Sequence, residues 1–317
     1  MLEYTLRRLC GTLLVIFGIL AIAFVILFML PGNPAETLAG PRANADTIKQ
    51  ISREMGLDLP LHQRFAKYLG KILRGDLGRS VINNKPITES IVEKFPYTLK
   101  LSLFAMFFSI FSGLVAGIIG AIYRGSLTDR FCTIISVLGI SIPIFLTGIL
   151  LLYFFAGKWK IFPTSAYGRT GSLMIFILPA LTLGIRSGAF LARIVRSSLS
   201  EVLNHDYIRT ARAKGLSKWR ILTWHALLNA LIPIVTVVAL DFSSFLNGSV
   251  IVETIFDLPG LGRFAMEAIL KRDYPVIQGV VLFSAIIFVF INFFVDLLYA
   301  WINPRIRDVE FGGSEQR

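Results

Sequence analysis

Hydrophobic residues along this chain gather in long runs that alternate with shorter polar segments. Six such runs cover residues Leu9–Leu30, Thr98–Tyr123, Phe131–Phe155, Leu173–Val195, Leu227–Val252 and Gln278–Trp301. Each run is long enough to cross a hydrocarbon core of about 30 Å as an α-helix that rises about 1.5 Å per residue. A helix also satisfies its own backbone polar groups, which lipid cannot do. The pattern therefore predicts an all-α integral membrane protein with six transmembrane helices.

The first run is the one that a secretory signal could imitate, because Arg7 and Arg8 precede it. It is longer than the roughly 7–15 residues of the apolar core of a signal, and no small-x-small cleavage site follows it. We therefore expect a retained first helix, with residues 1–96 forming that helix and a small extracytoplasmic insert. We expect residues 97–305 to hold the other five helices and residues 306–317 to form a cytoplasmic tail.

The polar insert contains two helical patterns and a turn. The helical patterns are Asp46–Met55 and Pro60–Leu73, and Pro60 suits the first turn of a helix. The second pattern places four apolar residues on one face, Leu61, Phe65, Leu69 and Ile72. Gly75-Asp76-Leu77-Gly78 is a turn signal. We expect this insert to fold on the outer surface.

Composition and charge agree with a membrane protein. Hydrophobic residues make up 55% of the chain and charged residues 16%, and the mean hydropathy is +0.69. The net charge of +12 could indicate a nucleic-acid partner, but the basic residues lie between apolar runs. With the N-terminus inside, the inner segments carry more than twice as many Lys and Arg residues as the two short outer loops. We therefore expect both termini in the cytoplasm, contact with membrane lipid and no nucleic-acid partner.

The basic segment Tyr207–Ile234 is predicted to form two short helices with a hinge between them. Asn204 or Asp206 can cap the first helix, because a short polar side chain accepts hydrogen bonds from first-turn N–H groups. Gly215 can adopt the left-handed conformation that follows the end of a helix. Ser217 can then cap a second helix that runs into the apolar stretch near Leu227. The whole loop covers residues 204–226.

This segment resembles the cytoplasmic coupling loop of ABC importer permeases. The common pattern is Glu-Ala-Ala, three residues, Gly, nine residues and Ile-x-Leu-Pro; Ala211 and Gly215 match it. Four positions depart from it, Arg209, Thr210, His225 and Leu228. These departures are similar to the version found in the oligopeptide, dipeptide and nickel branch. The stretch from Glu253 to Arg307 and the motifs GLDLPL and GDLGRS resemble the same branch.

The resemblance implies a set of partners and a role for the loop. It implies a second homologous permease subunit, two cytoplasmic ATPase subunits and an extracytoplasmic substrate-binding protein, in the cytoplasmic (inner) membrane of a bacterium or archaeon. The residues that it implies in coupling to the ATPase are Tyr207, Arg209, Thr210, Ala211, Ala213, Lys214 and Gly215. This chain has no G-x-x-x-x-G-K-[ST] loop. We therefore expect no cofactor in this chain, with ATP and Mg on the partner ATPase subunits, and alternating access as the mechanism.

Ionisable residues inside apolar runs are candidates for function because burying them in lipid is costly. Asp241 lies midway through the fifth run, and Ser244 and Asn247 follow on the same helical face. These three residues are candidates for a translocation path, although hydrogen bonding between helices uses the same residue types. Arg186 lies nearer the inner end of its run, from which a long side chain can reach the interface.

Other motifs do not indicate catalysis or a cofactor. Gly260–Ala265 matches G-x-G-x-x-A, but membrane runs flank it and no βαβ unit surrounds it, so we expect a turn outside the membrane. Gly113 and Gly117 form a GxxxG pair that can pack closely against another helix. His62, His205 and His225 lack metal-ligand spacing, and Cys10 and Cys132 both fall at apolar segments. We expect no metal site.

Two substrate classes and two other protein classes stay open. Within the branch, di- or oligopeptides are favoured, and nickel or a metal chelate is the alternative. A stand-alone channel or ion-coupled transporter would carry several ionisable residues at mid-membrane and internal repeats. A membrane enzyme would need a constellation of reactive groups, and the sequence shows none.

Overall fold

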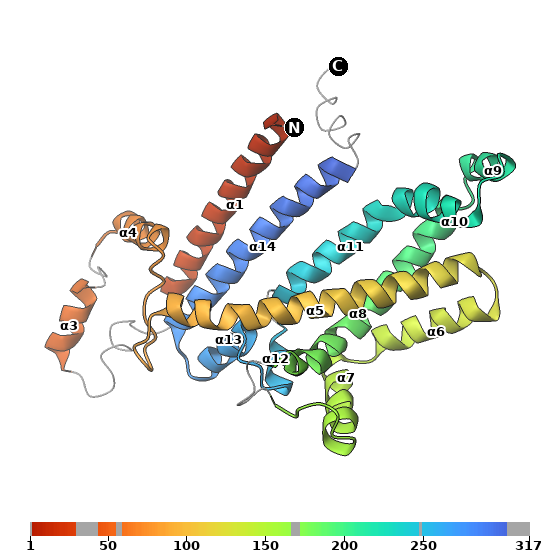
Figure 1. Cartoon of the computed structure of the whole chain (residues 1–317). Helices are drawn as coiled ribbons and strands as arrows, with labels where there is room; N and C mark the ends of the chain where they lie inside the picture. Colours follow the sequence, from red (N-terminus) through yellow and green to blue (C-terminus); the bar gives the residue numbers. More distant parts are fainter. Residues whose placement is uncertain (1, 30–43, 55–58, 166–171, 247–248, 303–317) are drawn as a thin grey trace. The chain divides into compact units, whose positions relative to one another are not determined.

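The computed structural model describes residues 2–29, 44–54, 59–165, 172–246 and 249–302, and these residues are helical apart from their connections (Figure 1). An isolated bridge between Arg79 and Pro86 is the nearest approach to a strand in these ranges. The all-α prediction is therefore confirmed. The predicted tail at 306–317 lies outside the described residues.

The chain divides into two compact units. The first comprises Met1–Pro96 and Arg263–Phe290, and the second comprises Tyr97–Gly262 and Ile291–Arg317. The helices of the first unit are α1 (Leu2–Met29), α3 (Ala45–Glu54), α4 (Leu61–Leu73), most of α13 (Leu261–Leu270) and the first part of α14 (Tyr274–Ile302).

In the first unit, α4 packs against α1 through aromatic rings. Phe65 meets Phe17 and Phe24 edge-on, at centroid distances of 5.7 and 5.2 Å. Tyr68 lies 5.6 Å from Phe24, and its hydroxyl accepts a hydrogen bond from Gln278 at 3.0 Å. Two predicted details change: Pro60 precedes the first turn of α4 rather than lying in it, and Leu61 stays exposed at the start of the helix.

The predicted turn after α4 is present. Gly75 and Gly78 both have positive φ, and the N–H of Gly78 donates to the Asp76 carboxylate at 2.9 Å. Shortly after this turn, the buried Ser80 hydroxyl donates to the buried carboxylate of Asp273. This bond fixes the connection between α4 and α5 to the residues just before α14.

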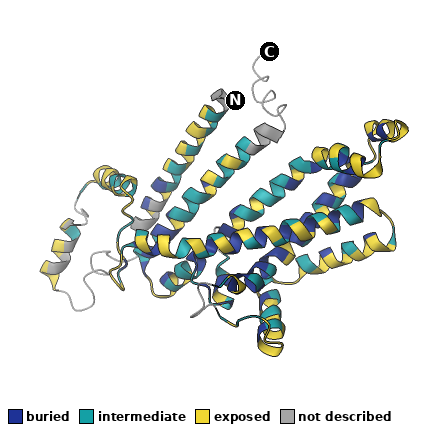
Figure 2. Cartoon of the chain, in the orientation of Figure 1, coloured by how far each residue is buried: buried dark blue, intermediate teal, exposed yellow. Residues whose placement is uncertain are grey.

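The second unit is built around α8, which is its most buried long helix (Figure 2). Helix α8 spans Met174–Val202. The unit also contains the part of α5 (Ile87–Ile122) from Tyr97 onward, α6 (Leu127–Ser141), α7 (Ile144–Leu151), the π-helical turns η1 (Leu152–Lys158) and η2 (Ile221–Leu227), α9 (Asp206–Ala213), α10 (Lys218–Arg220), α11 (Leu228–Leu246) and α12 (Val250–Ile255). A Cβ on Gly113 would lie 2.8 Å from the Leu191 side chain, and one on Gly117 would lie 2.5 Å from Val195. The GxxxG pair therefore brings α5 and α8 into close contact, as predicted.

Five helices in the described ranges are long and apolar enough to cross a membrane, and the number rises to six if a bent pair counts as one span. That pair is Leu127–Ser141 and Ile144–Lys158, which meet at 100° next to Pro143. The third predicted span is therefore broken rather than straight. The second helix also begins at Ile87 rather than Thr98, and the fifth ends at Leu246 before the separate helix α12.

Candidate functional site

The basic loop folds into the predicted pair of helices around Gly215. Gly215 has a φ of +77°, and its N–H donates to the carbonyl of Arg212 at 3.0 Å. The N–H of Leu216 reaches back to the carbonyl of Ala211 at 3.3 Å. Together these bonds form a Schellman motif, which ends α9 and satisfies carbonyls that would otherwise lack donors. Ser217 then accepts from the N–H of Arg220, so its predicted cap is confirmed.

The predicted cap of the first helix is wrong. His205 occupies the N-cap position of α9 and makes no side-chain cap bond. The Asn204 amide instead donates to the carbonyl of Ser200 at the end of α8, at 2.8 Å. Asp206 lies one residue too late, inside the first turn, where its carboxylate is 3.6 Å from Arg209. A negative charge at this end still favours the helix through its dipole.

One face of α9 is buried and holds the helix to the rest of the second unit. Ile208, Ala211 and Ile221 form a buried apolar cluster, against which Leu203 and Leu216 pack. Because Leu216 belongs both to this cluster and to the Schellman motif, the hinge and the packing stabilise the same geometry. Ala211 is the only residue of the predicted coupling set that is buried in the structure.

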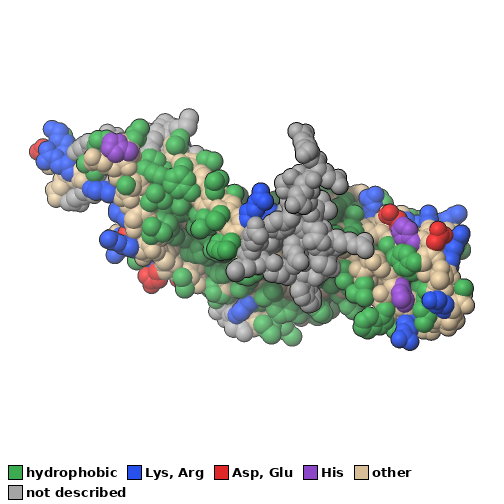
Figure 3. Space-filling model, turned by 90° about the horizontal axis from the view of Figure 1, so that it is seen from above, with side chains coloured by type: hydrophobic (Ala, Val, Ile, Leu, Met, Phe, Trp, Pro, Cys, Tyr) green, Lys and Arg blue, Asp and Glu red, His purple; other side chains and the backbone are tan. Residues whose placement is uncertain are grey.

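The opposite face of α9 is exposed and basic. Arg209, Thr210, Ala213 and Lys214 all lie in the solvent-accessible part of the surface. Lys and Arg side chains gather over α9 and α10 (Figure 3). Tyr207 is exposed as well, and its hydroxyl donates to the carbonyl of His225 at 3.4 Å. Desolvation raises the pKa of this phenol above its ordinary value, at which the hydroxyl is already protonated at neutral pH.

Two exposed tryptophans lie next to this face, and neither was predicted to be functional from the sequence. Trp219 and Trp224 are 72% and 69% exposed. They border a hollow of about 670 Å³, together with Ser217, Arg220, Thr223 and His225. Large exposed aromatic side chains among basic ones are typical of protein–protein or membrane-interface surfaces. The signal was available as two Trp residues five positions apart in a basic segment.

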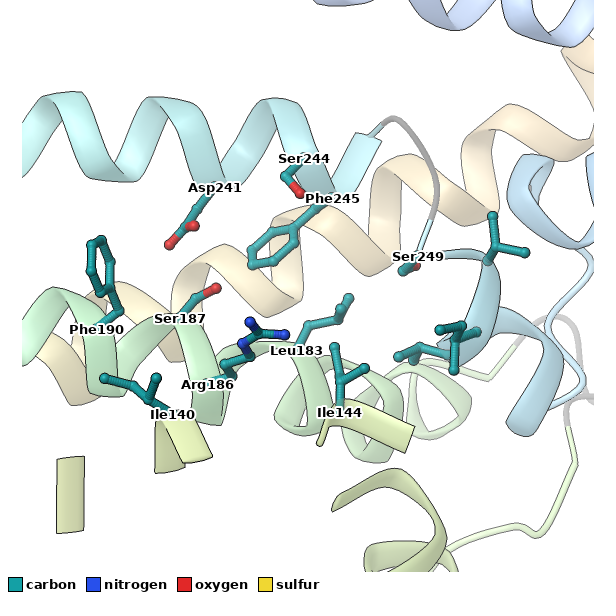
Figure 4. Close-up of a pocket in the computed structure, with 13 residues that line it drawn as sticks. Ile140, Ile144, Leu183, Arg186, Ser187, Phe190, Asp241, Ser244, Phe245 and Ser249 are labelled. Atoms are coloured by element: carbon teal, nitrogen blue, oxygen red, sulfur yellow. The ribbon is translucent and has the colours of Figure 1, made fainter. Parts of the chain in front are cut away.

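A larger cavity of about 690 Å³ opens between α8 and α11 (Figure 4). Most of its wall is apolar, from residues Ile140, Ile144, Leu183, Phe190, Phe245 and Val250–Val252. Its polar groups are Arg186 and Ser187 from α8, Asp241 and Ser244 from α11, and Ser249 just before α12. The Asp241 carboxylate and the Ser187 hydroxyl point toward one another across it (Figure 4).

This cavity brings together two of the three predicted path residues and adds one that was set aside. Asp241 and Ser244 line it as a pair, whereas Asn247 lies outside the described residues. Arg186 was expected to reach the interface, because its apolar run stopped at Val195. Since α8 continues to Val202, Arg186 lies near the middle of the helix, and its side chain lines the cavity instead.

The glycines at 260 and 262 surround an acid rather than a phosphate. Glu253 is fully buried and accepts a hydrogen bond from Thr98 at 2.8 Å. A Cβ on Gly260 would lie 2.4 Å from the Glu253 carboxyl carbon. A carboxylate at this position would repel a phosphate. The predicted turn is present only at Gly260, because Leu261–Ala265 form the start of helix α13 rather than a turn. Within the described residues, no group of three His, Cys, Asp or Glu side chains is placed to hold a metal.

Comparison with known proteins gives consistent matches along the chain. Residues 113–308 match the family described as binding-protein-dependent transport system inner membrane component, and residues 1–102 match the N-terminal family of such membrane components. The chain is 42% identical to the glutathione transport system permease protein GsiC of Escherichia coli O6:H1, over 97% of this chain and 99% of the relative. The corresponding protein of Salmonella paratyphi A is 41% identical over the same shares.

Solved structures show a similar fold. An inward-facing form of the MetNI methionine ABC transporter aligns with a TM-score of 0.57 at 20% identity, covering 67% of this chain and 96% of that one. An amino acid ABC transporter with histidines aligns with a TM-score of 0.53 at 17% identity, covering 67% and 93%. At these identities the likeness concerns the fold.

Proposed function

This chain belongs to the family of binding-protein-dependent transport system inner membrane components, and we propose that it passes di- or oligopeptides across the membrane by alternating access. It is a multi-pass inner-membrane permease of an ABC importer, and ATP is hydrolysed by a separate subunit. The family implies a complex with ATPase and substrate-binding protein partners. We propose six spans, with the α3–α4 insert outside and both termini in the cytoplasm.

The observation that carries this proposal is the construction of α9. The helix is fixed to the second unit by Ile208 and Ala211, yet its opposite face is exposed and basic. Such a helix can transmit force, because its buried face is packed against the second unit while its exposed face is free to contact another protein. We infer that Tyr207, Arg209, Thr210, Ala213 and Lys214 contact a cytoplasmic ATPase, with Ala211 and Gly215 shaping the helix that presents them.

The path of force runs from the hinge into a membrane helix. From Lys218 to Leu246, α10, η2 and α11 follow one another without a break, so movement at Gly215 reaches α11 directly. The ATPase must contact this loop differently in its two states, because equal contact would shift no equilibrium. Two permease subunits and two ATPases, as the resemblance implies, would let two such loops move together.

Peptides are the proposed substrate because the relatives over nearly the full chain are named as glutathione permeases. Glutathione is a tripeptide, so the name agrees with a peptide-like cargo. The described residues hold no cluster of metal-binding side chains, and a binding protein would perform most of the selection for either substrate class.

The test is ATP hydrolysis by the complete complex in lipid vesicles. We expect hydrolysis and uptake to rise when the binding protein is loaded with peptide. We expect stimulation and uptake to fall about tenfold in Gly215→Val, because a β-branched residue is strained at positive φ. Gly215→Asn is the matched control, because Asn tolerates this backbone, and it should retain most coupling.

Two results would contradict the proposal. Stimulation by nickel-loaded but not peptide-loaded binding protein would replace the substrate with a metal or its chelate. Equal stimulation of ATP hydrolysis and equal uptake in the Val and Asn variants would show that the backbone of Gly215 is not needed to transmit force, even if peptide transport continued.

A further inference from the structure

The cavity between α8 and α11 carries one positive and one negative side chain in a largely apolar wall. Arg186 is exposed to the cavity, and Asp241 is half-buried on the facing helix (Figure 4). The volume of about 690 Å³ falls within the range of about 300–1,000 Å³ that is usual for small-molecule sites. Its size and open side suit a short, flexible ligand.

Both charged groups have unused binding capacity in the part of the chain that the structure describes. One oxygen of the Asp241 carboxylate is buried without a hydrogen-bond partner, and so is the hydroxyl of Ser249. Arg186 has no ion pair with any described acid. Charges in the middle of membrane helices are costly unless something pairs with them. Arg186 and Asp241 attract one another across the cavity, but no ion pair within 4 Å joins them, so each keeps capacity to bind a ligand group.

We propose that this cavity binds the two ends of a zwitterionic peptide during transport, with Arg186 holding the α-carboxylate and Asp241 holding the α-ammonium group. This inference rests on the proposed peptide substrate and names the residues that recognise it.

The chemistry of the two ends fits the two side chains. A guanidinium can donate two parallel hydrogen bonds to a carboxylate. An ammonium group has three N–H donors. One can donate to the Asp241 carboxylate, and the other two can donate to the hydroxyl oxygens of Ser187 and Ser244. The apolar remainder of the wall can accept different side chains without selecting among them. A bare divalent cation would meet a single carboxylate and be repelled by Arg186, so the cavity favours peptide over metal.

The experiment measures binding to the complete permease–ATPase complex in nanodiscs, without nucleotide or binding protein. Leaving out the binding protein is essential, because it would itself select for peptide ends. The ligands are radiolabelled alanyl-phenylalanyl-alanine, its C-terminal amide and its N-acetyl derivative, measured by equilibrium dialysis. Comparing one protein change with one ligand change isolates the interaction between the two groups.

We expect Arg186→Gln to weaken binding of the free tripeptide about tenfold and to leave binding of the amide unchanged, because the amide lacks the carboxylate. Asp241→Asn should weaken binding of the free tripeptide by a similar factor and leave binding of the N-acetyl derivative unchanged, because that derivative lacks the ammonium group. Arg193→Gln is the matched control: it removes an exposed arginine from the same helix, outside the cavity, and should leave all three ligands unaffected.

Several outcomes would overturn the inference. Equal weakening of the acid and the amide by Arg186→Gln would show that the charge pairing is wrong. Absence of binding to the wild-type complex, in a system that still imports the tripeptide with its binding protein, would remove this site and leave the proposed function standing. Failure of import with every peptide-loaded binding protein would overturn the peptide substrate itself.

Discussion

At the scale of single residues, the best-buried polar cluster of the second unit is centred on Thr98. Its hydroxyl donates to the fully buried Glu253 and accepts from the N–H of Leu261, both at 2.8 Å. One side chain thus satisfies an acid on α12 and a backbone donor at the start of α13. A buried donor or acceptor that loses its partner costs about 1–3 kcal/mol.

We therefore expect Thr98→Val to lower the free energy of unfolding by about 1–3 kcal/mol, because valine keeps the shape but removes the hydroxyl. Thr98→Ser keeps the hydroxyl and is the matched control, with a smaller loss. Thermal unfolding of the purified complex, followed by intrinsic fluorescence, measures both. Identical melting temperatures for the two variants would show that the hydroxyl contributes little.

Two residue-level predictions that rest on local rules, at Gly215 and Ser217, are confirmed, whereas the predicted cap by Asn204 or Asp206 is wrong. Gly215 was identified because only a few residue types suit a left-handed position after a helix. Arg186 was misjudged, since its role depends on where α8 ends and on which helix faces it. The burial of Glu253 was not foreseen either, because its partner Thr98 is distant in sequence.

At the scale of elements, the contact between α5 and α8 depends on glycine residues, which have no side chain to keep the helices apart. A Cβ on Gly117 would lie 2.7 Å from the backbone oxygen of Ala192 and 2.5 Å from Val195. A backbone atom cannot rotate away as a flexible side chain can. The two helices must therefore separate to admit even one methyl group.

Gly117→Ala should destabilise the complex by about 1–3 kcal/mol through overpacking. The control is Gly18→Ala in α1, where the added Cβ meets nothing within 4 Å and alanine is the better helix former. Melting temperature and yield of assembled complex report both changes. If the two variants had the same melting temperature, the close approach of α5 and α8 would not be needed for stability.

Helix positions were predictable from the long apolar runs, whereas helix breaks were not. Pro143 coincides with a 100° bend, yet Pro96, Pro179 and Pro233 lie inside continuous helices. Proline removes one backbone donor in every case, so packing around it decides whether the chain bends. The early start of α5 was missed for a similar reason, since the stretch from Ile87 to Pro96 is not uniformly apolar.

At the scale of the whole molecule, the proposed topology assigns each loop of the second unit to one side of the membrane. The loop that contains Lys214 is assigned to the cytoplasm, and the loop that contains Lys160 is assigned to the outside. Both residues are exposed in the structure. Orientation follows from the distribution of Lys and Arg between short loops, a property of the sequence rather than of any contact.

The expected result is that an impermeant maleimide labels Lys160→Cys in intact spheroplasts and labels Lys214→Cys only after the membrane is opened. The natural thiols at Cys10 and Cys132 are first replaced by alanine. Labelling of Lys214→Cys from outside would invert the topology and place α9 beyond the reach of a cytoplasmic ATPase.

The bend at Pro143 affects how well the bilayer can accommodate this subunit on its own. Neither arm is a full crossing by itself: α6 has 15 residues, and α7 with its 8 residues continues through only the 7 of η1, against the roughly 20 that a bilayer requires. Acyl chains, which lie side by side, cannot follow a right-angled turn. A second permease subunit packed against this bend would prevent the bilayer from being distorted there. We therefore expect the subunit expressed alone to be degraded faster in cells than the subunit expressed with its partner.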